Sequence, residues 1–515
     1  MKIHNTLWQA IFGRTTLLVI LLLGQITLLV WGFSLLDKYI FIFNYIIGVA
    51  AALIILSILN ARQNSSFKMV WIILILCIPL LGVCFYLFTR LQPGTQLIEK
   101  RIEKILELEK DALAQDQEVL ARLEEESPQV ASISKYLHDF GMYPTYNQCQ
   151  VEYFPLGEDK FHRMIEEIKG ARKFIFMEYF IVSKGYMWDT ILDLLVEKVK
   201  EGVEVRFMYD GTCTLSLLPR NYPKKMEALG IQCKVFAPII PFLSTYQNNR
   251  DHRKVLVIDG HTAFTGGVNL ADEYINEVER FGHWKDTAIM IKGKGVDSFT
   301  LMFLQMWDLK KKSPINFKRY INRPQAPYDP VHSTGYVIPY GDSPFDGENV
   351  GERVYMDILY NAKKYVHIMT PYLIIDDEMS IALAFAAKKG VDVILMLPHI
   401  PDKFYAYILA RTYYEELIEA GVKIYEYTPG FVHAKVFTSD DNTAVVGTIN
   451  LDFRSLYLHF ECAAYIYQNP VVKEIEIDFQ NTLEKCQQIT MEDCKSYSIF
   501  KKTLGKVLRI IAPLM

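Results

Sequence analysis

The stretch His252-Arg253-Lys254-Val255-Leu256-Val257-Ile258-Asp259, followed by Gly266-Gly267-Val268-Asn269, decides how this chain of 515 residues folds, because it occurs twice. The second copy begins 181 residues later and reads His433-Ala434-Lys435-Val436-Phe437-Thr438-Ser439-Asp440, followed by Gly447-Thr448-Ile449-Asn450. The histidine, the lysine, the aspartate, the first glycine and the asparagine all recur at this offset. A single His-x-Lys would be chance, but two copies matching at five such positions, each at the start of an apolar run, indicate a duplicated functional unit.

Strand periodicity puts the histidine and the lysine of each copy on one face, because alternate residues of a strand point the same way. An ammonium group and an asparagine amide can bind the non-bridging oxygens of a phosphoryl group, and imidazole can act as nucleophile or acid. Two copies packed about a pseudo-twofold axis would bring both histidines to one site. One histidine would attack phosphorus while the other protonates the leaving oxygen. This chemistry requires no metal, and neither a metal nor a cofactor is predicted.

A longer repeat surrounds the motif. Residues 171–176 (Ala-Arg-Lys-Phe-Ile-Phe) are echoed by 362–367 (Ala-Lys-Lys-Tyr-Val-His), and residues 200–205 are echoed by 388–393. In both copies a strand-length apolar run precedes a helix-like stretch, and Gly-Val-x-Val then begins another strand. This alternation is typical of βαβ units around a mainly parallel sheet. The sequence therefore predicts an α/β protein with two domains of one kind, at 136–330 and 331–497.

The first 90 residues are predicted to form a helical membrane anchor, because they hold three uncharged apolar runs at 15–36, 39–59 and 69–88. Each run is long enough to cross a hydrocarbon core of about 30 Å. Only Asp37 and Lys38 separate the first two runs, so one of the runs is compatible with a re-entrant or interfacial helix. Two or three spans therefore remain open. Four Lys and Arg on one side against five on the other do not fix the orientation.

The formal net charge of −4 is unevenly distributed. Six Lys and Arg and one Asp give the first 90 residues a charge of +5, which leaves −9 for the remainder. An acidic body argues against nucleic acid as a partner, because phosphate binding normally needs a basic surface. Residues 91–135 are predicted to be a linker containing an amphipathic helix from 97 to about 125, with apolar residues at helical spacing. The eight cysteines have neither disulfide-framework nor zinc-ligand spacing.

The duplicated His-x-Lys-x4-Asp pattern resembles the phospholipase D superfamily. Within it, the apolar N-terminus, Gly266-Gly267-x-Asn269 with Asp272-Glu273-Tyr274, and residues 447–455 resemble the bacterial cardiolipin synthases. The resemblance implies two phospholipase D-like repeats packed with pseudo-twofold symmetry, behind a multi-pass anchor in the bacterial cell membrane, with the catalytic body on the cytoplasmic side. It also implies a phosphatidyltransferase that converts two phosphatidylglycerols into cardiolipin and glycerol through a phosphohistidine intermediate. Its partners would be phosphatidylglycerol and other membrane lipids.

The resemblance further implies a role for each motif residue. It favours His252 as the nucleophile and His433 as the general acid and base, although the likeness of the two copies leaves that order open. The residues that would bind the phosphate are Lys254, Lys435, Asn269 and Asn450. The aspartates that complete the two catalytic motifs are Asp259 and Asp440, which we expect to support the site rather than react. Two further carboxylates, Asp286 and Glu461, match positions that hold the other ring nitrogen of each histidine.

Two apolar segments are compatible with a membrane role or an internal role. The first copy carries about ten extra residues within 237–251, because the glycines before the motif are offset by 191 and the histidines by 181. This insertion could seat acyl chains or the membrane surface, or act as a lid. At 498–515 apolar residues recur at i, i+4, i+7, i+8 and i+11 among basic residues. The pattern predicts a basic amphipathic helix that lies on an anionic lipid surface or docks onto the body.

Three other functions are compatible with parts of this pattern. A hydrolytic phospholipase D has every motif residue and differs only in whether water or an alcohol reaches the phosphohistidine. A membrane-tethered nuclease of the same superfamily is disfavoured by the acidic body and the apolar runs. A catalytically idle lipid-binding scaffold is disfavoured because both motifs are intact. The residues leave transfer and hydrolysis open, and the resemblance favours transfer.

Overall fold

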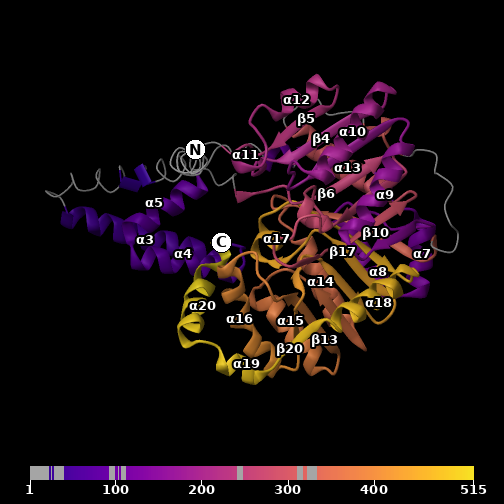
Figure 1. Cartoon of the computed structure of the whole chain (residues 1–515). Helices are drawn as coiled ribbons and strands as arrows, with labels where there is room; N and C mark the ends of the chain where they lie inside the picture. Colours follow the sequence, from indigo (N-terminus) through magenta and orange to yellow (C-terminus); the bar gives the residue numbers. More distant parts are fainter. Residues whose placement is uncertain are drawn as a thin grey trace, which may run out of the picture.

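The computed structural model describes residues 23–24, 26–27, 40–91, 99–102, 104–105, 112–239, 248–309, 317–321 and 333–514. Two α/β units lie one above the other in Figure 1, and a helical arm projects from the side of the molecule. Each unit has its own main sheet with helices packed beside it. The predicted α/β architecture of two repeats is therefore confirmed.

The first repeat is built on a seven-stranded sheet. The strands, in their order across the sheet, are β2 (Gln150–Phe154), β9 (Ala288–Lys292), β7 (Thr262–Gly266), β6 (Lys254–Ile258), β3 (Phe174–Tyr179), β4 (Glu204–Asp210) and β5 (Gln232–Phe236). Its helices are α9 (Gly157–Gly170), α10 (Tyr186–Lys200), α11 (Cys213–Ser216), α12 (Tyr222–Ala228), η3 (Asp272–Ile275) and α13 (Val296–Asp308).

The second repeat is built on a nine-stranded sheet. The strands, in order, are β1 (Tyr146–Asn147), β10 (Tyr336–Asp342), β19 (Glu461–Tyr467), β17 (Thr443–Gly447), β16 (Val436–Ser439), β11 (Tyr365–Met369), β13 (Asp392–Pro398), β14 (Lys423–Tyr427) and β20 (Cys486–Ile489). The helices are α14 (Val350–Asn361), α15 (Asp377–Lys388), α16 (Phe404–Glu419), α17 (Phe453–Tyr457), α18 (Val471–Leu483), α19 (Met491–Ser496), α20 (Ile499–Ile511) and η6 (Ala512–Leu514). Short elements outside both main sheets are η4 (Phe317–Arg319), β8 (His283–Lys285), β12 (Leu373–Ile374), β15 (Gly430–Val432) and β18 (Leu451–Asp452).

The two sheets are mixed rather than mainly parallel, which corrects the prediction from the sequence. In the first repeat β3, β4 and β5 pair in parallel, whereas β6 pairs antiparallel with both β3 and β7. The motif strand and the strand after it form a hairpin, and a hairpin can only be antiparallel. The same arrangement recurs in the second repeat, where β16 pairs antiparallel with β11 and β17.

The predicted linker contains more than one helix. Residues 112–116 are not helical, and α7 (Gln117–Glu126) begins where Asp116 accepts a hydrogen bond from the backbone N–H of Glu118. The helix predicted from 97 to about 125 is therefore interrupted, because an aspartate at this position caps a new helix start. After α8 (Pro128–Asp139), strand β1 pairs with β10, so a segment assigned by sequence to the first repeat completes the sheet of the second.

The arm consists of α3 (Ile40–Asn60), α4 (Ser65–Cys77) and α5 (Pro79–Arg90). The predicted span at 39–59 coincides with α3, which is long and apolar enough to cross a membrane. The run at 69–88 does not form one helix, because it breaks at Ile78 between α4 and α5. Pro79 causes this break, since proline disfavours the helical conformation of the residue before it. The predicted span at 15–36 lies outside the described residues, apart from 23–24 and 26–27.

The motif aspartates Asp259 and Asp440 lie at the far end of the motif strands from the histidines. Asp259 accepts hydrogen bonds from the backbone N–H groups of Arg172, Lys173 and Phe174 at 2.6–2.8 Å. Asp440 accepts the equivalent three bonds from the backbone N–H groups of Lys363, Lys364 and Tyr365, the last of which begins β11. Both aspartates have a positive φ in the hairpin turn. They hold the start of a neighbouring strand, which is compatible with the expectation that they support the site rather than react.

We expect Asp259→Ala to lower the free energy of unfolding by about 3 kcal/mol, because three backbone donors lose a charged acceptor. Thermal unfolding of the detergent-solubilised chain would measure this loss. The matched control is Asp193→Ala, which removes an exposed carboxylate on α10 and should change stability by less than about 0.5 kcal/mol. Equal melting temperatures for the two variants would contradict this structural role.

Candidate active site

The two motif histidines lie where the repeats meet. Each precedes its motif strand and is held by backbone pairing with the other repeat: the N–H of His252 donates to the carbonyl of Phe460 at 2.9 Å, and that of His433 donates to Lys285 at 2.7 Å. Around His433 this pairing extends into the parallel strands β15 and β8. The junction between the repeats therefore fixes the backbone of both histidines.

Each histidine also contacts a carboxylate from the other repeat. Nδ1 of His252 lies 2.8 Å and 3.0 Å from the two carboxylate oxygens of Glu461. Nδ1 of His433 lies 2.6 Å from Oδ2 of Asp286. The structure thus brings together four of the residues predicted from the sequence, in two pairs that cross between the repeats. Pairing at Nδ1 fixes the tautomer and leaves Nε2 for chemistry.

The electrostatics of these pairs favour neutral imidazole beside ionised carboxylate. Burial lowers the pKa of His433 to about 4 and holds the pKa of His252 well below its usual value. Burial alone would raise the pKa of Glu461, but the adjacent His252 outweighs it and the pKa lies below its usual value. The pKa of Asp286 is likewise lowered by His433 against the effect of burial. A neutral histidine can act as a nucleophile or accept a proton.

The two motif lysines are fully buried at the same junction. Nζ of Lys254 donates to the carbonyl of His252 at 2.6 Å, and Lys435 donates to the carbonyl of His433. Burial lowers the pKa of Lys254 to about 8 and that of Lys435 to about 7, although Asp286 and Glu461 attract both ammonium groups. Cations in a dry site bind an anionic phosphodiester more strongly than cations in water.

The two motif asparagines differ in the partners they have. The side chain of Asn269 accepts from the backbone N–H of Ile181 and donates to the hydroxyl of Tyr274, both at 2.9 Å. It therefore fixes a loop and has one amide hydrogen to spare. Oδ1 of Asn450 is buried without a hydrogen-bond partner among the described residues. An amide oxygen accepts and does not donate, so this unpartnered atom gives no support to the predicted phosphate contact of Asn450, and the contact of Asn269 is limited to its one remaining amide hydrogen.

The sequence reasoning missed two buried groups near the histidines. His459 packs at a tilt with its ring centroid 5.4 Å from that of His252, and its Nδ1 lies 3.8 Å from Glu461. Among the described residues neither ring nitrogen has a hydrogen-bond partner. The repeat could have identified His459, because it lies two residues before Glu461 just as Trp284 lies two residues before Asp286. Trp284 packs at 5.4 Å from His433. Lys160 is fully buried on α9 with its pKa lowered to about 7, mainly by burial. The helical spacing could have identified this lysine, because Lys160 lies at i on the same apolar face as Met164 at i+4 and Ile168 at i+8.

One group within the described residues could hold a metal ion. The ligand atoms of His252, His459 and Glu461 lie within 4.8 Å of one another, and two histidines with one glutamate are a known zinc donor set. Two of the three already form the hydrogen-bonded pair described above. In the predicted metal-free reaction, His252 is instead the nucleophile and Glu461 is the carboxylate that orients it.

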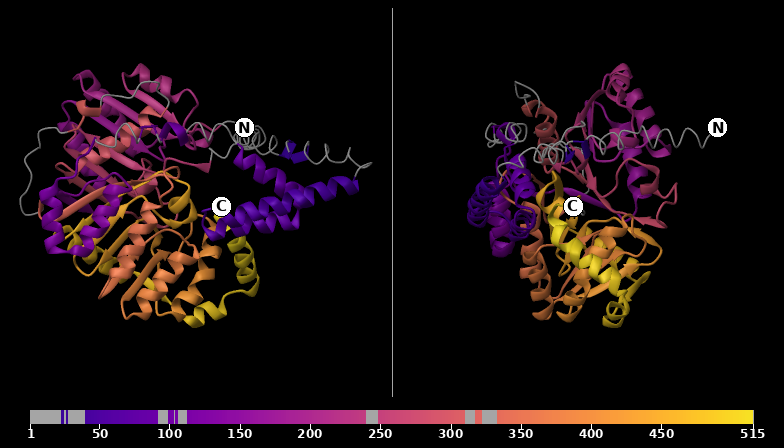
Figure 2. Two further views of the ribbon diagram at one scale, coloured as in Figure 1. Left: turned by 180° about the vertical axis from the view of Figure 1, so that it is seen from behind. Right: turned by 90° about the vertical axis from the view of Figure 1, so that its left-hand side faces the viewer.

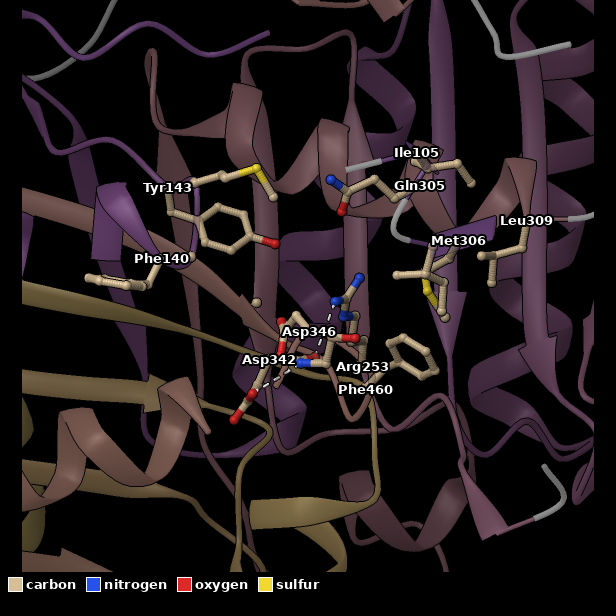
Figure 3. A pocket seen from close by; sticks show the side chains of 15 residues that line it. Ile105, Phe140, Tyr143, Arg253, Gln305, Met306, Leu309, Asp342, Asp346 and Phe460 are labelled. Atoms are coloured by element: carbon tan, nitrogen blue, oxygen red, sulfur yellow. Dashed lines mark hydrogen bonds between the residues drawn. The ribbon is translucent and has the colours of Figure 1, made fainter. Parts of the chain in front are cut away.

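Arg253, between the histidine and the lysine of the first motif, points away from them and ties the repeats together. It lies between Asp342, Asp346 and Phe460 in a small pocket (Figure 3). Its guanidinium donates to the carbonyl oxygens of Glu461 and Met302 at 3.0 and 3.3 Å. The residue that follows the nucleophile candidate therefore bonds to the strand that carries its carboxylate.

Residues 240–247 of the predicted insertion lie outside the described residues. The described ends of the insertion are tied to the body. Arg250 donates to the carbonyl of Ala237 at 2.8 Å, and Asn249 donates to the carbonyl of Leu458 at 2.9 Å. The insertion therefore begins and ends beside the segment that carries His459.

We expect anion binding at this site to weaken as the pH rises through about 7 to 8, because Lys435 and Lys254 lose their charge in that range. Sulfate is a suitable probe, since its own charge is constant there. Isothermal titration of the solubilised chain with sulfate at pH 6 and pH 9 should show at least tenfold weaker binding at pH 9. Lys435→Met is the control and should show weak binding at both values. An affinity that is equal at both pH values in the wild-type chain would contradict the lowered pKa values.

Comparison with known proteins identifies the family of this chain. Residues 164–307 and 355–483 match the family described as "Cardiolipin synthase, PLD-like domain", and residues 49–90 match "Phospholipase_D-nuclease N-terminal". The chain is 50% identical over 461 residues to an uncharacterized protein of Streptococcus mutans, covering 90% of this chain and 99% of that protein.

Two relatives carry a functional name. A cardiolipin synthase of Alkalihalophilus pseudofirmus is 30% identical over 505 residues, covering 92% of this chain and 95% of that protein. A cardiolipin synthase of Geobacillus thermodenitrificans is 31% identical over 509 residues, covering 98% and 99%. The solved structure of a phosphatidylserine synthase from Haemophilus influenzae matches the fold, with a TM-score of 0.56, 15% identity, and coverage of 74% of this chain and 98% of that one. The chain therefore belongs to the phospholipase D-like bacterial cardiolipin synthases and is a phosphatidyltransferase of that superfamily.

Proposed function

We propose that this chain joins two phosphatidylglycerols into cardiolipin and glycerol through a phosphohistidine intermediate. The observation that carries the proposal is the pair of buried neutral histidines, each bonded at Nδ1 to an ionised carboxylate of the other repeat. Two buried lysines beside them supply positive charge for one phosphodiester. The curated relatives named above are cardiolipin synthases, which gives the substrate class.

In the first step Nε2 of His252 attacks the phosphorus of the donor lipid. A P–N bond forms, the P–O bond to the terminal glycerol breaks, and Nε2–H of His433 gives its proton to the departing glycerol oxygen. Glu461 stabilises the charge that develops on His252, because its carboxylate lies against Nδ1. Lys254 and Lys435 stabilise the phosphoryl oxygens, whose negative charge increases in the transition state.

In the second step the acceptor lipid restores the enzyme. A free hydroxyl of the acceptor's glycerol headgroup attacks phosphorus, its proton passes to Nε2 of His433, and the P–N bond to His252 breaks. The product carries two phosphatidyl groups on one glycerol. If water takes the place of the acceptor hydroxyl, the same residues give phosphatidic acid, which is the hydrolytic alternative.

The first step requires His433 to be protonated, although its pKa is lowered to about 4 before substrate binds. Burial is the main cause, and the charges of Lys435 and Lys254 add to it. A bound phosphodiester anion offsets that positive charge and so raises the pKa of His433. Protonation of the acid is therefore coupled to binding of the donor lipid.

The two-histidine mechanism predicts that the solubilised enzyme converts phosphatidylglycerol in mixed micelles into equal amounts of cardiolipin and glycerol without added nucleotide. We expect His252→Ala and His433→Ala each to lower kcat by at least about 10³-fold, because each histidine is needed in both steps. Thin-layer chromatography and an enzymatic glycerol assay would measure the products. Phosphatidic acid as the main product would instead favour hydrolysis.

A p-nitrophenyl ester of phosphatidic acid separates the roles of the two histidines. Nitrophenolate leaves without a proton, so His433→Ala should release about one equivalent rapidly and retain the lipid on the protein. His252→Ala should give no burst, because it lacks the nucleophile. The opposite pattern would exchange the two roles, and substantial turnover of phosphatidylglycerol by either variant would contradict the mechanism.

We further infer that the chain is a multi-pass membrane protein whose catalytic body faces the cytoplasm. The helix α3 and the family assignment support membrane association, and the family resemblance supports the orientation. Trypsin added outside intact spheroplasts should leave the body whole, whereas trypsin added to inverted vesicles should cleave it. Immunoblotting against a C-terminal tag would measure this. Cleavage from outside would contradict the orientation.

A further inference from the structure

The C-terminal helix α20 is fixed to the body along one side. A Cβ at Gly505 would lie 2.6 Å from the side chain of Thr412, so the helix approaches α16 very closely. The guanidinium of Arg509 lies 4.1 Å from the ring centroid of Tyr413 and bonds to Glu416 at 3.0 Å. The docking onto the body that the sequence left open is therefore present, and it fixes which side of the helix faces outward.

The outward side of α20 is apolar. Ile499 and Phe500 are 82% and 76% exposed, and four further large apolar residues of α20 and η6 are exposed, namely Val507, Ile510, Ile511 and Leu514. We call these six residues the α20 face. An amphipathic helix normally buries its apolar stripe. Here only one side of the helix packs against the body, and the six residues of the α20 face remain exposed. A contiguous exposed apolar patch of this kind marks an interaction surface.

Basic residues lie beside the α20 face, and the patch continues onto α16. Nζ of Lys501 lies 5.7 Å from the ring centroid of Phe404, which is 60% exposed in the first turn of α16. Lys502 and Lys506 lie on the same helix, and no carboxylate occurs within it. Cations around an exposed apolar strip complement an anionic lipid surface, in which acyl chains lie beneath negative headgroups.

The α20 face is continuous with the helical arm. The segment η6, which follows α20 directly, contacts α4. The arm in turn is bound to the body where Asn64 donates to the hydroxyl of Tyr457 at 2.9 Å and Phe67 packs at 5.7 Å from Phe453. In Figures 1 and 2 the arm and α20 lie on the same side of the molecule, and α20 runs across the direction in which the arm projects. If the arm enters a bilayer, α20 lies along the surface of that bilayer.

From these observations we propose that the α20 face, with Phe404, is a membrane-contact surface that inserts into the headgroup region of an anionic bilayer. The arm anchors the chain at one point, and α20 supplies a second contact that fixes the tilt of the body relative to the bilayer. This inference rests on the membrane association of the proposed function, and it adds the orientation in which the enzyme meets its lipid.

A photo-crosslinking experiment on the full chain tests this surface. The probe p-benzoylphenylalanine replaces Phe500 in one variant and Phe404 in a second, and the control places it at Phe140, an exposed residue 57% accessible at the end of α8. In Figure 1 α8 lies on the side of the molecule opposite the arm. Each variant is reconstituted in vesicles of equal parts phosphatidylglycerol and phosphatidylcholine, with one lipid radiolabelled at a time, and irradiated.

We expect at least tenfold more lipid adduct at positions 500 and 404 than at 140, with labelled phosphatidylglycerol exceeding labelled phosphatidylcholine at least twofold. Adduct at 500 and 404 no greater than at 140 would overturn the proposal. Crosslinks from 500 to a second copy of the chain, in place of lipid, would also overturn it and identify a dimer contact. Because adduct formation requires no turnover, a chain that makes no cardiolipin could still give the expected result, which separates this test from that of the proposed function.

Discussion

Each motif histidine is paired with a carboxylate from the other repeat, and the rest of the site depends on these two crossed pairs. Glu461 begins the strand β19 of the second repeat and bonds to His252 of the first, while Asp286 does the reverse for His433. Breaking a buried pair of this kind by removing one partner typically costs about 3–5 kcal/mol. The same packing that stabilises the junction thus also sets the tautomer of both histidines, and neither repeat contains a complete site.

The symmetry between the repeats fails directly behind the histidines. A side chain at Gly267 would collide with Asp286, whereas the equivalent Thr448 bonds through its hydroxyl to Glu461. The carboxylate of Asp286 lies against the backbone of Gly267, so only a glycine fits at that position. The carboxylate of Glu461 lies where the hydroxyl of Thr448 can donate to it. His459 packs at a tilt against His252, and Trp284 packs at a tilt against His433. One histidine therefore has an imidazole beside it and the other has an indole, so their surroundings differ.

The sequence predicted what repeats and periodicity can encode. The offset of 181 identified the duplicated motif, and the apolar run at 39–59 identified α3. The sequence did not show that Asp259 caps a neighbouring strand, because that bond joins residues 85 or more positions apart. Nor did it show that each carboxylate crosses to the other repeat, since spacing along the chain does not distinguish a contact within a repeat from a contact between repeats. The break at Ile78 was predictable from Pro79, but hydropathy alone does not register it.

The distribution of charge explains why the enzyme must be held at its substrate. A body with a charge of −9 repels anionic lipids at long range, although screening limits this to about 8 Å at physiological ionic strength. The cations that we propose bind the phosphodiester are Lys254 and Lys435, and both are buried, so they would act only once the headgroup has entered the site. Burial strengthens the attraction of both ammonium groups for a phosphate, but only at short range. Burial also lowers the pKa values of both lysines, so the attraction is lost at pH values where they lose their charge. A site of this kind cannot attract substrate from a distance. A chain that is fixed beside the bilayer does not require such attraction, because the lipid is already at high local concentration.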